Sequence, residues 1–235
     1  HVIDNVADPG AAEALTCADF ERGFILDRRA FHHPLVRDRD KKLVPYTPQK
    51  RAHVTGITLH QTACDMGERP ERYDTISVHY VVLRSGRIVW TCDVDKILYG
   101  GNGWNNRCIQ IEVNGLYPGL EDDPDTAADE SLRTTWDDPT TPTREHPQEV
   151  TPAAMLSLRM LVRYLKLRHP SIVILCAHRQ ASGDRRNDPG ERIWKGEAVP
   201  LMAELGLQDG GVGFTIGDGL AIPEAWDPRC KGVRY

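Results

Sequence analysis

Two short segments with strand-like sequences each end in a histidine. Residues 54–60 (VTGITLH) alternate apolar side chains with polar or small ones, which is typical of a half-buried strand. Residues 171–178 (SIVILCAH) form a nearly continuous apolar run, which predicts a central strand covered on both faces. Because strands hold side chains rigidly, His60 and His178 are predicted to lie at the rim of a cleft.

Further segments predict an α/β fold with a central mixed β-sheet flanked by helices. A turn containing Gly86 joins two β-rich segments, as expected of a hairpin. In residues 108–113 (CIQIEV), Gln110 and Glu112 share one face and the aliphatic residues the other. Thr151, followed by proline, is a typical N-cap for the clearest helix. The expected strands are residues 54–60, 77–83, 88–92, 108–113 and 171–178, and the expected helices are residues 151–169 and 197–207.

The chain is predicted to contain one principal domain with two attachments. Residues 1–51 are polar and interrupted by prolines, as in an N-terminal arm or small subdomain, and residues 208–235 form a tail rich in glycine and proline. Residues 52–207 carry the sheet and helices. Within them, residues 115–150 hold ten acidic residues against two arginines, and we expect a long surface loop or a flap beside the substrate.

Composition excludes several classes of protein. No run of 18 apolar residues exists and the N-terminus lacks a signal-peptide pattern, so we expect a soluble chain without a membrane span. The formal net charge is −5, and nothing indicates nucleic-acid binding. Six cysteines occur without a C-x-x-C pair, which excludes a zinc ribbon and a thioredoxin motif, and we expect most of them to be buried.

His60 and His178, together with Asp188 in the loop after the second histidine, form a plausible set of three metal ligands. A catalytic zinc site takes three protein ligands and leaves the fourth position to water. Spacing alone does not identify the metal, because imidazole and carboxylate also bind other transition metals.

Four stretches, in their order along residues 52–207, resemble the landmarks of the N-acetylmuramoyl-L-alanine amidase family. This family includes phage-lysozyme-type amidases, the bacterial anhydromuropeptide amidase and the peptidoglycan recognition proteins. The matching stretches are residues 57–63 (ITLHQTA), 77–80 (SVHY), 108–114 (CIQIEVN), and 177–178 (AH) with 188–190 (DPG).

The resemblance implies roles for individual residues. His60, His178 and Asp188 stand where the family has its zinc ligands, and Glu112 matches a glutamate that acts near the metal-bound water. Val78 replaces the tyrosine of the phage-type enzymes, which favours the glutamate subgroup. Arg186 stands where the family commonly has a lysine aimed at the developing oxyanion, and Arg185 is the alternative cation.

Substrate contacts are less well marked. Residues 98–101 (LYGG) stand where many family members have Trp-His-Ala-Gly, so Tyr99 replaces a histidine that lines the substrate site. Trp104 and Asn106, in the loop 100–106 (GGNGWNN), are candidates for stacking on a sugar or peptide and for polar contact. His79 either lines the same pocket or is an ordinary half-buried strand histidine.

The function implied by the resemblance is zinc-dependent hydrolysis of the amide bond between N-acetylmuramic acid and L-alanine, with peptidoglycan or muropeptides as partners. Two other functions fit the same residues: a recognition module that binds muropeptides without cutting them, and a zinc hydrolase acting on another amide. The biological role is open between phage endolysin, autolysin, recycling enzyme and injected effector.

Overall fold

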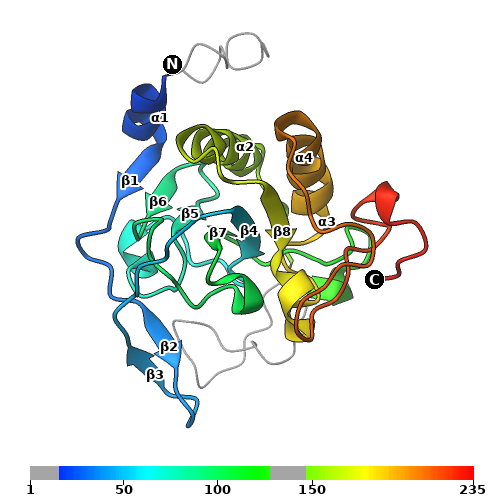
Figure 1. Ribbon diagram of the computed structural model, residues 1–235, viewed down its shortest axis with the longest axis horizontal. Coiled ribbons are helices and arrows are strands. Elements are labelled where there is room, and N and C mark those ends of the chain that lie inside the picture. Colours follow the sequence, from blue (N-terminus) through cyan, green and yellow to red (C-terminus); the bar gives the residue numbers. More distant parts are fainter. Residues whose placement is uncertain (1–15, 128–146) are drawn as a thin grey trace.

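The computed structural model describes residues 16–127 and 147–235, and a six-stranded mixed sheet runs through its centre (Figure 1). Neighbouring strands are parallel, except for the antiparallel pair that forms the predicted hairpin of residues 80–90. The predicted α/β class with a mixed sheet is therefore confirmed. Across the sheet, the strands are β1 (Ile25–Asp27), β6 (Ile88–Trp90), β5 (Tyr80–Val82), β7 (Cys108–Val113), β4 (Gly56–Gln61) and β8 (Ile174–Ala177).

The longest helix is α2 (Pro152–Arg168), as predicted. The Thr151 side chain accepts a hydrogen bond from the Ala154 N–H and so caps one of its free amide groups. The second predicted helix begins six residues earlier than expected. It consists of α3 (Glu191–Ile193), a π-helical turn (Trp194–Ala198) and α4 (Val199–Leu205), which follow one another without a break.

The helices α2 and α4 cover one face of the sheet (Figure 1). Alternation along β4 and β7 separates the two faces, because successive strand side chains point in opposite directions. The helix-side face contributes to the main core through Ile57, Leu59, Ile109 and Ile111, which pack with Leu158, Leu161 and Leu201. The other face of the same strands carries Thr58, His60, Gln110 and Glu112.

Strand β8 is an edge strand of the sheet, and the prediction that it is central was wrong. It pairs only with β4 among the strands, although Leu175, Cys176 and Ala177 are fully buried. The chain that follows α4 covers its outer edge: the Leu175 N–H donates to the Gln208 carbonyl, and the Gln208 N–H donates to the Val173 carbonyl. This backbone cover explains why a sheet edge has the apolar sequence of an interior strand.

Described segments before β4 and after α4 also contribute to the sheet and core. In the first part of the chain, α1 (Cys17–Phe24) leads into β1, which extends the main sheet beside β6. A separate hairpin, β2 (Leu35–Arg37) and β3 (Leu43–Pro45), follows. In the tail, Trp226 is fully buried and its indole N–H donates to the Gly119 carbonyl. The domain boundaries at residues 51 and 207 stay a prediction.

The acidic segment is only partly described. Residues 128–146 lie outside the described residues, whereas Tyr117, near the start of the segment, is buried in the main core.

The six cysteines form no disulfide, and four of them are buried, as expected for most of them. Within residues 16–127 and 147–235, no helix is both long and apolar enough to span a membrane.

Candidate metal centre

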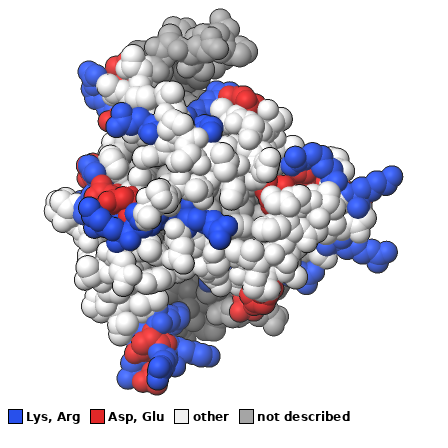
Figure 2. Space-filling model, in the orientation of Figure 1, with Lys and Arg blue, Asp and Glu red and all other residues white. Residues whose placement is uncertain are grey.

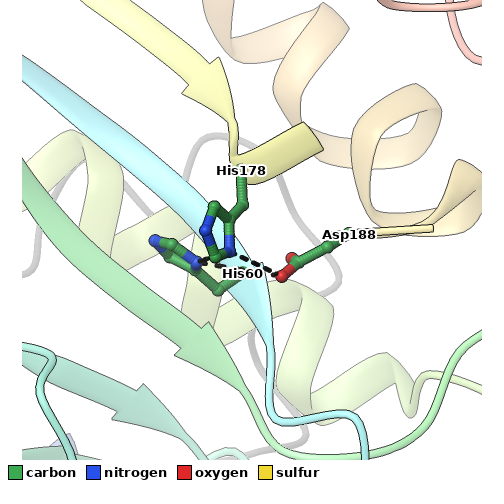
Figure 3. Close-up of side chains that lie close together, drawn as sticks. All are labelled: His60, His178 and Asp188. Carbon is green, nitrogen blue, oxygen red and sulfur yellow. Dashed lines mark hydrogen bonds and ion pairs between the residues drawn. The ribbon is translucent and has the colours of Figure 1, made fainter. Parts of the chain in front are cut away.

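His60, His178 and Asp188 meet beside the end of β4, with their side chains pointing toward one another (Figure 3). The two histidine Nδ1 atoms lie 2.9 Å apart. Asp188 Oδ2 lies 2.9 Å from Nδ1 of His178 and 3.9 Å from Nδ1 of His60. Three residues that are distant in the sequence therefore present three donor atoms to one point.

Each histidine uses its other ring nitrogen in a hydrogen bond to an amide oxygen. His60 Nε2 lies 2.7 Å from Gln110 Oε1, and His178 Nε2 lies 3.0 Å from Asn102 Oδ1. Because an amide oxygen only accepts, each Nε2 carries the proton and each Nδ1 keeps a lone pair. Two lone pairs that face each other at 2.9 Å repel, unless a cation lies between them.

The donor set fits a zinc ion. Zinc–nitrogen and zinc–oxygen bonds of about 2.0 to 2.1 Å in a tetrahedron place neighbouring ligand atoms about 3.3 Å apart, and the three observed separations, 2.9, 2.9 and 3.9 Å, bracket that value. Burial lowers the pKa of both His60 and His178 to about 3, so both rings are neutral at neutral pH. Among the described residues, no fourth His, Cys, Asp or Glu joins this group.

The end of β4 fixes the loop that carries Asp188. The Gln61 backbone N–H donates to Asp188 Oδ1 at 2.9 Å, and the Gln61 side-chain amide donates to the Asn187 carbonyl at 2.7 Å. Burial raises the pKa of Asp188 to about 6, against the opposing effects of His60 and Arg185. A bound cation would favour its ionised form.

Glu112 lies next to His60 across two parallel strands, because β4 and β7 pair in a register that sets these two residues opposite each other. Its side chain is partly exposed, but its Oε2 atom is buried and has no hydrogen-bond partner. Burial raises the pKa of Glu112 well above its ordinary value, and the charge of Asp188 raises it further. An unpaired carboxyl oxygen beside a metal site is free to exchange a proton with a bound molecule.

The two candidate cations, Arg185 and Arg186, differ in their surroundings. The positive charge of Arg185 opposes the burial effect on the pKa of Glu112 and of Asp188, and adds to it for His178. Arg186 is exposed, and its guanidinium lies 4.9 Å from the centre of the Tyr235 ring. The role of Arg186 at the oxyanion stays a prediction, and these charge effects favour the alternative, Arg185.

Two of the four predicted substrate contacts are corrected. His79 is fully buried, and its ring bonds to Arg51 and to the backbone N–H of Gln110. Trp104 is 1% exposed and packs in the protein interior against Phe214. Neither ring has a face free for a ligand, because local packing already covers it.

The other two predicted contacts lie at the surface. Tyr99 is 47% exposed, with its ring 5.0 Å from that of Tyr46, and Asn106 is exposed. Both remain predictions.

Gln110 and Asn102, which hold the two histidines, were not among the predicted site residues. Gln110 shares a strand face with Glu112, which was a usable signal. Asn102 adopts a left-handed backbone conformation (φ 49°) in the glycine-rich loop, which asparagine tolerates better than most residues. Gly101 lies so close to Gln110 that a Cβ at position 101 would overlap the Gln110 side-chain amide. This loop therefore packs directly against the residue that accepts the hydrogen bond from His60.

No curated protein matches the chain. Solved structures that are similar to it include the N-acetylmuramoyl-L-alanine amidase LysC from Clostridium intestinale URNW (18% identity, 78% of this chain and 98% of that chain, TM-score 0.49). A second is the Ph2119 endolysin from Thermus scotoductus MAT2119 bacteriophage Ph2119 (18% identity, 78% of this chain and 99% of that chain, TM-score 0.48). A third is Drosophila peptidoglycan recognition protein SD (12% identity, 75% of this chain and 92% of that chain, TM-score 0.47).

The family of the chain follows from its match to a family model. The model described as N-acetylmuramoyl-L-alanine amidase matches residues 49–191, which is more than half of the chain. The matched residues include both histidines of the centre, Asp188 and Glu112. The chain therefore belongs to the N-acetylmuramoyl-L-alanine amidase family.

Proposed function

We propose that this protein is a zinc-dependent amidase that hydrolyses the amide bond between N-acetylmuramic acid and L-alanine in bacterial peptidoglycan. The observation that carries the proposal is the convergence of two unprotonated Nδ1 atoms and a carboxylate oxygen within 2.9 to 3.9 Å of one another. Membership of the N-acetylmuramoyl-L-alanine amidase family is the reason for proposing this bond as the one that is cut.

His60, His178 and Asp188 would hold the zinc ion. Gln110 and Asn102 would keep the two imidazoles in the tautomer that binds it, since each accepts the Nε2 proton. When bound, zinc would act as a Lewis acid on water and on the scissile carbonyl.

Glu112 would move the proton that the reaction requires. Hydrolysis joins the oxygen of water to the carbonyl carbon and breaks the bond from that carbon to the alanine nitrogen. Glu112 would accept a proton from the attacking water and then deliver it to the leaving nitrogen, so that the carboxyl group returns to its starting state. Its raised pKa and its unpaired Oε2 suit a group that carries a proton for part of the cycle.

Arg185 would supply the positive charge for the carbonyl oxygen, which becomes negative as water adds. Its charge already acts on both carboxyl groups of the centre. Arginine hardly loses a proton, so it would stabilise charge rather than transfer protons.

The direct test is mass spectrometry of purified peptidoglycan digested with the zinc-loaded protein. We expect peptides with a new N-terminal L-alanine and glycan strands with intact sugars. His178→Ala should release no peptide and bind no zinc, whereas His53→Ala should behave as the wild type, because His53 is exposed and precedes the strand that carries His60. Zinc content is measured on the same samples.

Other outcomes would contradict the proposal in distinguishable ways. A protein that co-sediments with peptidoglycan but releases no peptide would be a recognition module. Zinc binding with intact peptidoglycan and no co-sedimentation would indicate a hydrolase of another amide. Peptide release by a zinc-free His178→Ala protein would remove the metal mechanism.

A further inference from the structure

A second group of charged side chains lies on the other side of the segment that joins His178 to Asp188. A cavity of about 350 Å³ opens there between this segment and the C-terminal tail. Three arginines contribute to its wall, and apolar tail residues complete it. Its lining includes Arg179, Arg186, Arg234, Tyr235, Leu220 and Val233. Figure 2 shows basic side chains projecting at the edge of the molecule where the tail lies.

Arg179 is the buried member of the three. It is 1% exposed, and its guanidinium lies 4.8 Å from the Trp226 ring centre and 5.0 Å from that of Tyr235. Its NH1 group donates to the Arg186 carbonyl at 2.5 Å, but its Nε–H has no hydrogen-bond partner. A buried guanidinium with an unused donor is costly unless an acceptor reaches it.

The positive charges around this cavity are uncompensated within the described part of the chain. No carboxylate there forms an ion pair with Arg179, Arg186 or Arg234. Like charges that share one partly apolar cavity repel each other, and an anion in the cavity would remove that repulsion.

We propose that this cavity is an anion-binding site that takes an oxyanion, either a carboxylate or a phosphate group. Guanidinium groups match both oxyanions through paired N–H donors. Assigning the oxyanion to the cell wall rests on the proposed function: it would be a carboxylate of the stem peptide or a phosphodiester of a polymer attached to the wall.

The cavity is linked to the metal centre through the backbone. Arg179 follows His178 directly, and its N–H donates to the Asp188 carbonyl at 3.1 Å. The Arg179 carbonyl in turn accepts the Leu220 N–H at 2.7 Å, which fixes the tail. An anion bound in the cavity would therefore be held by the segment that supplies two metal ligands, and a polymer could engage both sites at once.

The first experiment measures binding of inorganic phosphate by isothermal titration calorimetry at constant ionic strength, using the full chain. We expect saturable binding in wild type and in His178→Ala, which removes a metal ligand and so separates this site from phosphate bound at zinc. The double variant Arg186→Gln/Arg234→Gln should bind about tenfold more weakly for each arginine removed. The control Arg39→Gln, an exposed arginine in the turn between β2 and β3, should bind as the wild type.

Absence of saturable binding in the wild type, or equal binding by the double variant, would overturn the site. These outcomes do not depend on amidase activity, so they are distinguishable from a failure of the proposed function. Loss of phosphate binding in His178→Ala alone would place the anion at zinc and would also overturn the site.

The second experiment identifies the source of the oxyanion. Soluble muropeptides with free and with amidated stem carboxylates are compared, as are walls with and without their phosphodiester polymer. Weaker muropeptide binding after amidation assigns the site to the stem peptide, and weaker wall binding after polymer removal assigns it to the phosphodiester. Each effect should disappear in Arg186→Gln/Arg234→Gln, and no effect of either change would overturn the assignment to the wall.

Discussion

His60 and His178 face each other through their Nδ1 atoms at 2.9 Å, although neither atom has a proton to donate to the other. The protons are on Nε2, where Gln110 and Asn102 accept them. This arrangement is unfavourable in the absence of a cation, because it brings two lone pairs together in a buried site. A bound zinc ion would turn the same contact into a source of stability.

Removing the metal should therefore destabilise the protein. At a free zinc concentration of about 100 times the dissociation constant, binding adds about 2.7 kcal/mol to the free energy of unfolding. For a chain of this size, that corresponds to a fall in Tm of about 5 to 10 °C on chelation. Calorimetry with and without a chelator measures the shift. His178→Ala should show no further fall, and an equal fall in that variant would argue against this centre as the zinc site.

Gln110 is expected to control zinc affinity without contacting the ion. Gln110→Leu removes the acceptor for the His60 Nε2 proton and should weaken zinc binding by about 10- to 100-fold. Gln110→Glu keeps an acceptor at that place and should retain most of the affinity. Competition with a chromophoric chelator gives the dissociation constants. Similar losses in both variants would mean that Gln110 acts only through packing.

Gly101 should be intolerant of a side chain. The Cβ of Gly101→Ala would overlap the Gln110 amide, and relieving that overlap should cost about 1 to 3 kcal/mol of folding stability. Because Gln110 would move, zinc affinity should fall as well. Gly23→Ala is the matched control, since nothing lies within 4 Å of its new methyl group and alanine favours the helix. Urea unfolding and the chelator assay report the two effects, and unchanged zinc affinity would disconnect the loop from the ligand.

Glu112→Gln should abolish proton transfer while leaving the zinc site intact. We expect kcat to fall by about 10² to 10⁴-fold, with stoichiometric zinc and an unchanged Tm in the presence of the metal. Peptide release followed over time measures kcat. A variant with full activity would exclude Glu112 as the acid-base group.

Arg185→Gln should lower kcat more than it raises KM, because the charge is needed as the carbonyl oxygen becomes negative. A loss on the order of 10²-fold is expected for one donor of this kind. Arg39→Gln again serves as the control for removal of a surface charge. A variant in which only KM changes would show that Arg185 binds substrate and does not stabilise the transition state.

Much of the fold could be predicted from the sequence, because β7 and α2 each have a sequence pattern that indicates their type. Residues 108–113 alternate between the two faces of a strand, and Thr151 with Pro152 begins a helix. Both patterns involve only residues that are close together in the sequence. The edge position of β8 could not be predicted in this way. Its apolar sequence arises from cover by Gln208, which is more than thirty residues away in the chain.

The residues of the candidate site also differ in whether the sequence could predict them. The resemblance to a family placed His60, His178 and Asp188, and the structure brings these three together. It left both Arg186 and Arg185 as candidates for the oxyanion, because adjacent residues in a tight turn point in different directions and the local sequence does not set which one faces the centre. The support of His178 by Asn102 joins residues 76 positions apart, and no local pattern reveals it.

The pairing of His60 with Glu112 across β4 and β7 also limits how relatives of this protein can diverge. Side chains alternate along a strand, so inserting or deleting one residue within β7 before Glu112 would replace its carboxyl group with an aliphatic neighbour on that face. Changes in length are therefore expected to accumulate in the connecting loops, while the six residues of each strand keep their number through evolution.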